Sequence, residues 1–92
     1  MTELDRILSV IRTTGFVARD GRDGANVYRA GVYTLYGTSV TVTAWDGISH
    51  SYEATVWRTL DQQLAGFRQA TTEEVTEFKR LEARRPAPSN WD

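Results

Sequence analysis

The chain has 92 residues, which is the length of one small domain with a single hydrophobic core. Its 11 basic and 12 acidic side chains give a net charge of −1, so no overall field attracts nucleic acid or an anionic membrane. The absence of cysteine excludes disulfides, thiolate nucleophiles and Cys-ligated zinc, and the single histidine, His50, excludes a multi-histidine metal site. We therefore expect a soluble globular protein that is not an enzyme and that uses no cofactor or metal.

The sequence carries no apolar run of the roughly 18 residues that a membrane span needs. Its first five residues, 1–5, include two acids where a secretory signal peptide would be basic. We expect a cytoplasmic protein, in a bacterial cell or in an infected host cell. Ten of the 11 basic residues are arginine, and they are scattered from Arg6 to Arg85 rather than clustered. This bias is typical of a GC-rich coding genome, such as that of an actinobacterium or its phage.

The first segment has the spacing of an amphipathic helix. Its apolar residues recur at i, i+3, i+4 and i+7, which places them on one stripe: Leu4, Ile7, Leu8 and Ile11. Thr2 is positioned to cap the start of this helix, and Gly15 to end it. Residues 16–18 follow as a short predicted strand, and two Asp-Gly pairs within residues 19–26 indicate an exposed loop or a wide hairpin tip.

From Val27 to Arg58 the apolar period changes to two, which predicts antiparallel strands joined by turns. Gly37-Thr38 suits a two-residue hairpin turn, because glycine fits the position that needs a positive φ. This turn would place Tyr36 opposite Ser39, with Leu35 opposite Val40 and Tyr33 opposite Val42.

The next turn, Trp45-Asp46-Gly47, allows two registers. A two-residue Asp-Gly loop mixes apolar and polar faces, whereas a three-residue loop with Gly47 left-handed keeps them separate. We therefore expect the three-residue loop, which pairs Ala44 with Ile48, Val42 with His50 and Val40 with Tyr52. Ala54 and Val56 would continue the core face.

Two helices are predicted after the sheet. Leu60, Leu64 and Phe67 have helical spacing, although Gly66 weakens or ends this helix. The last helix begins with the capping-box pattern of Thr71 and Glu74. It buries Val75, Phe78 and Leu81, and it ends at Pro86. Residues 86–92 are expected to form a flexible tail.

These patterns predict one small α+β domain over residues 1–85. It would consist of an N-terminal helix, an antiparallel β-meander of three to four strands, and one or two C-terminal helices packed on one sheet face. If the helices cover the face that bears Val42 and His50, the opposite face carries one charged residue, Glu53.

An uncharged sheet face is the main functional signal in the sequence. Protein interfaces are depleted in charge and enriched in Tyr and Trp, so this face predicts contact with another protein or a homodimer. The alternative is that threonine is simply a good strand former that tolerates water. The expected partner-binding residues are Tyr28, Val32, Thr34, Tyr36, Thr41, Thr43, Ser51 and Trp57. The expected function is therefore a small protein-binding module, an inhibitor or adaptor type of accessory protein.

Two other functions remain open. Arg19, Arg22 and Arg29, together with Tyr28, could contact nucleic acid, although Asp20 and Asp23 neutralise this region. His50 and Tyr33 could instead line a ligand or enzymatic cleft between sheet and helices, but a core or core-edge histidine that forms its hydrogen bonds internally is the more frequent case. Strand alternation also directs Ser49 and Ser51 away from His50.

Overall fold

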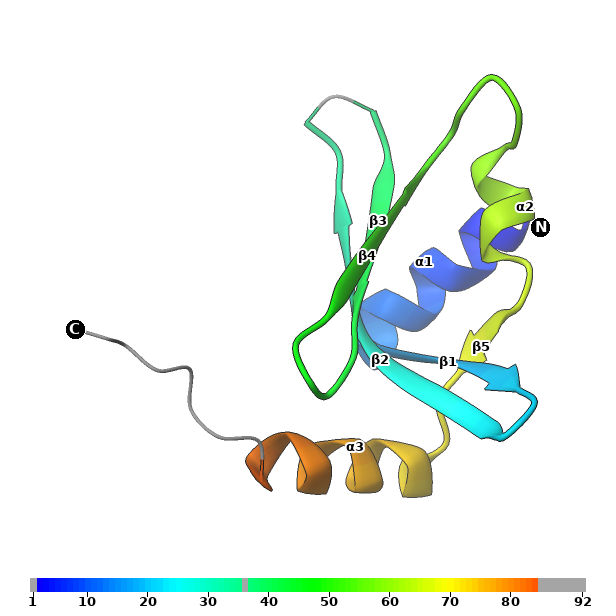
Figure 1. Cartoon of the computed structure of the whole chain (residues 1–92). Helices are drawn as coiled ribbons and strands as arrows, with labels where there is room; N and C mark the ends of the chain where they lie inside the picture. Colours follow the sequence, from blue (N-terminus) through cyan, green and yellow to red (C-terminus); the bar gives the residue numbers. More distant parts are fainter. Residues whose placement is uncertain (1, 36, 85–92) are drawn as a thin grey trace.

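The computed structural model of the chain describes residues 2–35 and 37–84. Within this part the elements are, in order, α1 (Glu3–Thr13), β1 (Phe16–Gly21), β2 (Gly24–Tyr33), β3 (Ser39–Thr43), β4 (Ser49–Glu53), α2 (Leu60–Leu64), β5 (Phe67–Gln69) and α3 (Thr72–Arg84). The strands form one antiparallel sheet in the order β4-β3-β2-β1-β5 (Figure 1). The predicted α+β class and antiparallel meander are confirmed, with β5 as an additional strand.

Helix α1 begins and ends at the predicted residues. The Thr2 hydroxyl accepts a hydrogen bond from the Asp5 amide at 3.0 Å, and Gly15 has a positive φ of 76° after the last turn. The Asp61 carboxylate of α2 accepts a hydrogen bond from the Leu4 amide at 2.8 Å, so the two helices are joined at the N-terminus of α1.

Helices lie on both faces of the sheet, whereas the sequence led us to expect all of them on one face. Val17 packs in a core cluster with Ile7 of α1. Its neighbours Phe16 and Ala18 point to the other face because side chains alternate along a strand, and they pack with Phe78 of α3. α1 and α2 therefore cover one face, and α3 covers part of the other (Figure 1). The start of β1, residues 16–18, is an uninterrupted apolar run, which is the pattern that a strand buried on both faces requires.

The register of β2 against β3 also differs from the prediction. Tyr33 pairs with Ser39, where the two-residue turn would have placed Tyr36. The connection spans residues 34–38, although Gly37 has the expected positive φ, 98°. The shift is three residues, an odd number, so it moves each side chain of β2 to the face opposite the predicted one.

The reversed strand changes which side chains reach the core. Val32 and Ala30 now pair with the buried Val40 and Val42 on the α1 side. Tyr33 points to the α3 side and is 62% exposed. The sequence prediction had placed Tyr33 in the core and Val32 on the open face.

The β3–β4 hairpin, in contrast, has the predicted register. Val42 pairs with His50 and Val40 with Tyr52. The Ala44 amide donates to the Ile48 carbonyl at 2.9 Å, and Gly47 has a φ of 90°, as the three-residue loop requires.

The segment after β4 departs from the predicted core face and helix. Val56 is 90% exposed and lies between the last strand of the meander and α2, so it does not extend the core. Leu60 and Leu64 are buried in α2, but Phe67 is buried in β5, beyond the end of that helix. Residues 19–26 are exposed, as predicted, and they form a tight β1–β2 hairpin, with Gly21 paired to Gly24, rather than a loop or a wide hairpin tip.

Helix α3 begins with the predicted capping box. The Thr71 hydroxyl accepts from the Glu74 amide at 3.1 Å, and the Glu74 carboxylate accepts from the Thr71 amide at 2.8 Å. Phe78 is its buried anchor and meets Phe16 edge to face, with the ring centroids 5.4 Å apart. The predicted tail, 86–92, lies outside the described residues.

Candidate interaction surface

Four hydroxyl side chains form an open platform on the α3 side of the sheet, beyond the part that α3 covers. We call this group the hydroxyl platform; it consists of Thr41, Thr43, Ser49 and Ser51. Thr41 and Ser51 hydrogen-bond to each other at 2.9 Å, and Thr43 and Ser49 do so at 2.8 Å. The threonines are half-buried and the serines exposed. These cross-strand pairs hold the hydroxyls in a fixed array.

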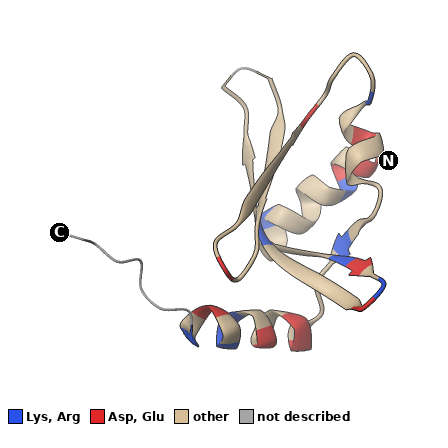
Figure 2. Cartoon of the chain, in the orientation of Figure 1, with Lys and Arg blue, Asp and Glu red and all other residues tan. Residues whose placement is uncertain are grey.

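Charged groups border the hydroxyl platform but do not enter it. Its β2 neighbours are Gly31, which has no side chain and pairs with Thr41, and Arg29, which pairs with Thr43. The Arg29 guanidinium is neutralised by Glu82 at 2.6 Å, and Glu53 stands at the far end of β4. In Figure 2 the β3–β4 hairpin is uncoloured except at Glu53 and at Asp46 in its turn. The low charge that was expected for a whole sheet face is therefore found over a smaller area, the hydroxyl platform.

The edge strand β4 presents backbone groups that the sheet does not use. The Ala44–Ile48 bond marks a hydrogen-bonded pair, and such pairs alternate along an antiparallel ladder. The amides and carbonyls of Ser49 and Ser51 therefore point away from β3, toward the edge. Further along, the Gln63 side chain donates to the Glu53 carbonyl at 2.6 Å. An edge of this kind is a template for another strand.

The opposite edge of the sheet, β5, is occupied by arginine side chains. Arg6 donates to the Phe67 carbonyl at 2.6 Å, and Arg68 donates to the Gln69 carbonyl at 3.1 Å. Charged side chains on an edge strand oppose the addition of a further strand. The two edges thus differ, and the edge that adjoins the hydroxyl platform carries charge only at Glu53, at the far end of β4.

Seven of the eight predicted partner-binding residues are described, and the structure brings three of these seven together: Thr41, Thr43 and Ser51. Tyr28 and Val32 lie on the α1 side, where they pack against the core; the Tyr28 ring is 6.0 Å from that of Phe67. This correction follows from the odd register shift of β2.

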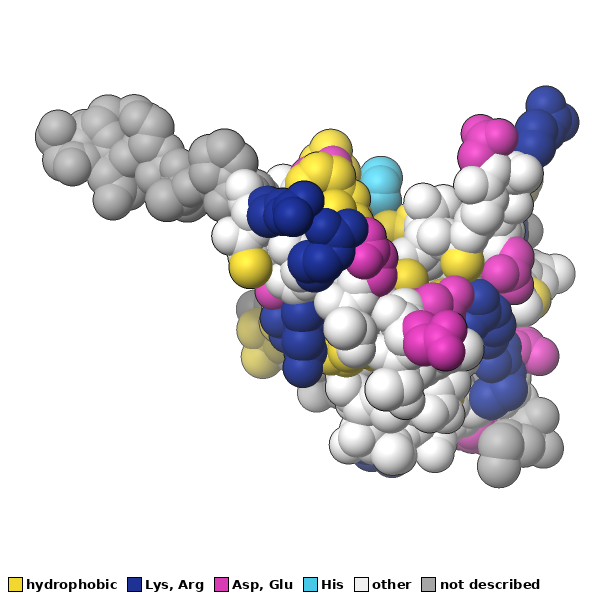
Figure 3. Space-filling view, turned by 90° about the horizontal axis from the view of Figure 1, so that it is seen from below, with side chains coloured by type: hydrophobic (Ala, Val, Ile, Leu, Met, Phe, Trp, Pro, Cys, Tyr) yellow, Lys and Arg dark blue, Asp and Glu magenta, His cyan; other side chains and the backbone are white. Residues whose placement is uncertain are grey.

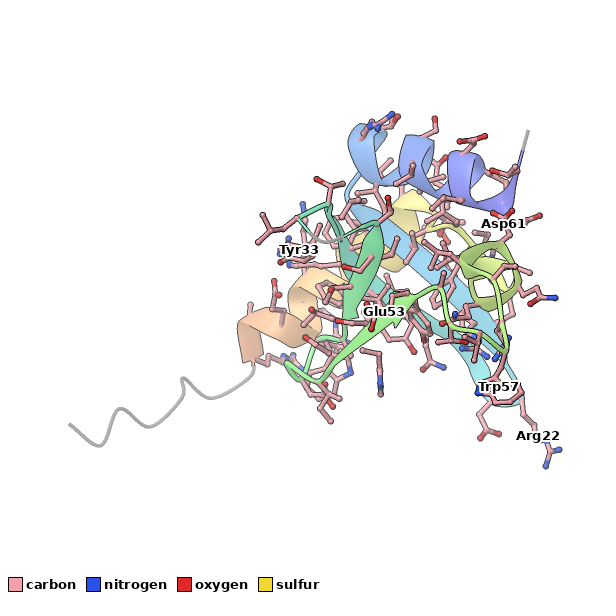
Figure 4. The ribbon with its side chains drawn as sticks, turned by 90° about the horizontal axis from the view of Figure 1, so that it is seen from above. Arg22, Tyr33, Glu53, Trp57 and Asp61 are labelled. Atoms are coloured by element: carbon pink, nitrogen blue, oxygen red, sulfur yellow. The ribbon has the colours of Figure 1, made fainter. Side chains whose placement is uncertain are left out.

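Two of the remaining predicted residues, Thr34 and Trp57, lie apart from the platform. Thr34 is exposed in the connection from β2 to β3. Trp57 is 87% exposed in the connection from β4 to α2, well away from Tyr33 in Figure 4. Tyr36 lies outside the described residues. Sequence reasoning did not place Gly31 and Tyr33 on the α3 side, because their placement depends on the length of the connection between β2 and β3.

The arginines considered for nucleic acid do not form one patch. Arg19 lies on the α1 side over the Phe67 ring, 5.6 Å from its centroid, whereas Arg29 lies on the α3 side over Phe16. Arg22 is in the β1–β2 turn and points away from the body of the molecule (Figure 4).

The proposed His50–Tyr33 cleft is not formed either. His50 pairs with Val42 as predicted, but it lies at the sheet edge and is exposed rather than buried. Tyr33 points to the opposite face. Among residues 2–35 and 37–84, no three His, Cys, Asp or Glu side chains are grouped to hold a metal ion.

A groove of about 430 Å³ adjoins the hydroxyl platform, between α3 and the β3–β4 turn. β2 forms its floor with Ala25 and Val27, and Phe78 and Leu81 of α3 add apolar surface. Its charged lining residues are all acidic: Asp46, Glu73, Glu74 and Glu77. Figure 3, seen from below, shows both acidic and basic side chains close to apolar ones on this side of the molecule. The groove was not expected from the sequence, because α3 was expected on the other face.

Comparisons with known proteins found no match to this chain among family models, curated proteins or solved structures. In the described part of the chain, no helix has the length and apolar character needed to span a membrane.

Proposed function

We propose that the chain is a non-catalytic protein-binding module, of the inhibitor or adaptor type, that contacts its partner through the hydroxyl platform and the adjoining edge of β4. The observation that carries this proposal is the combination of an uncharged open sheet area with an uncapped edge at Ser49 and Ser51. Added strands gain main-chain hydrogen bonds at such an edge, and neighbouring side chains supply specificity. The partner is a second copy of the chain or another protein.

The composition of the area supports binding more than solvation. A quarter of the chain is charged, yet Gly31 and the four platform residues carry no charge. Solvent-facing sheets and edges usually carry Lys or Glu, which prevent unwanted pairing. Tyr33, 62% exposed on the same face, adds the aromatic surface that protein interfaces favour.

Two variants test the proposal. Thr41→Arg places a charge at the centre of the platform. Ser51→Pro removes an amide that points outward, and edge strands tolerate proline at such a position. Thr13→Arg, at an exposed site on α1, is the matched control. Sedimentation measures self-association, and affinity capture from the native host measures binding to other proteins; circular dichroism verifies that each variant is folded.

We expect the wild type and Thr13→Arg to self-associate or to retain the same captured protein, and folded Thr41→Arg and Ser51→Pro to lose it. If all four proteins sediment as monomers and capture the same set of proteins, the proposal is overturned.

A further inference from the structure

The groove between α3 and the β3–β4 turn has acidic groups on two separate walls. Glu73 and Glu77 stand on α3, and Asp46 stands on the turn that faces them. Glu77 is paired with Arg80, and Glu74 is paired with Arg68. Within the described part of the chain, Glu73 and Asp46 form no salt bridge. No lysine or arginine among the described residues lines the groove, so the negative charges of Glu73 and Asp46 have no described basic partner at its rim.

The floor of the same groove is apolar. Val27 and Ala25 come from β2, and Leu81 lies half-buried on the facing side of α3. The volume of about 430 Å³ is within the range of roughly 300–1,000 Å³ that ligand pockets occupy. A ligand that fits such a site has an apolar part for the floor and a positive charge for the rim.

We propose that this groove binds a basic, partly apolar segment of a protein partner, an arginine or lysine beside an aliphatic or aromatic residue. Charge complementarity determines this occupant, because an acidic or neutral segment would leave Glu73 and Asp46 desolvated without a counter-charge. Arginine is the residue best suited to contact carboxylates in this way, since its guanidinium binds them through two hydrogen bonds.

The position of the groove relates it to the hydroxyl platform. Thr43 of the platform is followed directly by Ala44 and Trp45, which line the groove. A partner that lies on the platform therefore reaches the groove without crossing another element. The inference deepens the proposed function and rests on it, because the occupant belongs to a protein.

Defined peptides test the groove without the natural partner. Three capped hexapeptides, which alternate leucine with arginine, glutamine or glutamate, are titrated into the ¹⁵N-labelled full chain. For the arginine peptide we expect amide shifts concentrated at Asp46, Glu77 and Leu81. We expect binding about tenfold weaker for the glutamine peptide, which corresponds to about 1.4 kcal/mol, and none for the glutamate peptide. Salt of about 1 M, where the Debye length is near 3 Å, should weaken binding of the arginine peptide.

The double variant Glu73→Gln/Glu77→Gln should reduce the affinity for the arginine peptide at least several-fold. Glu3→Gln is its matched control, because Glu3 pairs with Arg6 at the same i,i+3 spacing on α1, as Glu77 does with Arg80. Equal binding of the three peptides, shifts centred elsewhere, or unchanged affinity in the double variant would overturn the inference.

The same variants separate this inference from the proposed function. Thr41→Arg abolishes association at the platform, if the proposed function holds, but leaves the arginine peptide bound in the groove. If Thr41→Arg loses partner binding and the wild type does not bind the arginine peptide, the proposed function is supported and the groove inference is overturned. If the arginine peptide binds at the groove and Thr41→Arg changes no association, the proposed function is overturned and the groove inference is supported.

Discussion

The guanidinium of Arg68 donates two hydrogen bonds to the carboxylate of Glu74, each at 2.8 Å, and so joins β5 to the first turn of α3. The same guanidinium also holds Asp20 of β1, at 2.9 Å. The hydrogen bonds from Arg68 to Glu74, followed by the one from the Thr71 amide, lower the pKa of Glu74 from 4.5 to about 2. The charged form of Glu74 is therefore favoured by the folded state.

The first prediction concerns acid stability. Because the pKa of Glu74 is lower in the folded chain, its contribution is present above pH 4.5 and is lost as the pH falls toward 2. Glu74→Gln keeps an oxygen acceptor for the Thr71 amide but removes the charge, so it should lower the free energy of unfolding by about 1 kcal/mol at pH 7. Urea unfolding of both proteins between pH 7 and pH 2.5 measures this difference. The difference should shrink below pH 4.5; a constant difference would contradict the assignment.

The second prediction tests the position of α3. Phe78 is 2% exposed against Phe16, so Phe78→Ala should cost about 3–5 kcal/mol of unfolding free energy. Val56, which the sequence pattern placed on the core face, is 90% exposed, and Val56→Ala should change stability by no more than about 0.5 kcal/mol. Chemical denaturation of both variants decides between the two arrangements, since a core that included Val56 would reverse their order.

The parts of the fold that sequence could predict were those determined by local chemistry. The caps at Thr2 and Thr71 and the turn at Gly47 depend on residues a few positions apart, and all three are present as predicted. The register of β2 depended instead on the length of one connection. Gly37 has a positive φ in either a short or a long connection, so its presence did not distinguish between them.

The same contrast between local and long-range features applies to the candidate surface. Thr41, Thr43 and Ser51 were placed correctly because β3 and β4 are joined by the local turn at Gly47. Tyr28 and Val32 were misplaced with the rest of β2. The acidic groove could not be predicted, because it requires α3 and the β3–β4 turn, more than 20 residues apart in the chain, to lie on the same side of the sheet.

The third prediction concerns His50. The ring is exposed at the edge of the sheet, so His50→Ala should change the free energy of unfolding by no more than about 0.5 kcal/mol. Val42, its partner across the strands, is 1% exposed, and Val42→Ala should cost about 2 kcal/mol. Thermal or urea unfolding of the pair provides the comparison. A large loss in His50→Ala would instead favour the core histidine that the sequence pattern suggested.

The fourth prediction uses two glycines of β2 that differ in backbone conformation. Gly24 has a φ of 118° at the β1–β2 turn, which side chains other than glycine rarely adopt, so Gly24→Ala should destabilise the chain by about 1–2 kcal/mol. Gly31 lacks a positive φ, and a Cβ added there meets no atom within 4 Å. Gly31→Ala should therefore raise the free energy of unfolding by about 0.5 kcal/mol, because it restricts the unfolded chain. Urea unfolding midpoints that move in opposite directions in the two variants would confirm both expectations. A loss of stability in Gly31→Ala would instead show that the sheet at Gly31 has no room for a side chain.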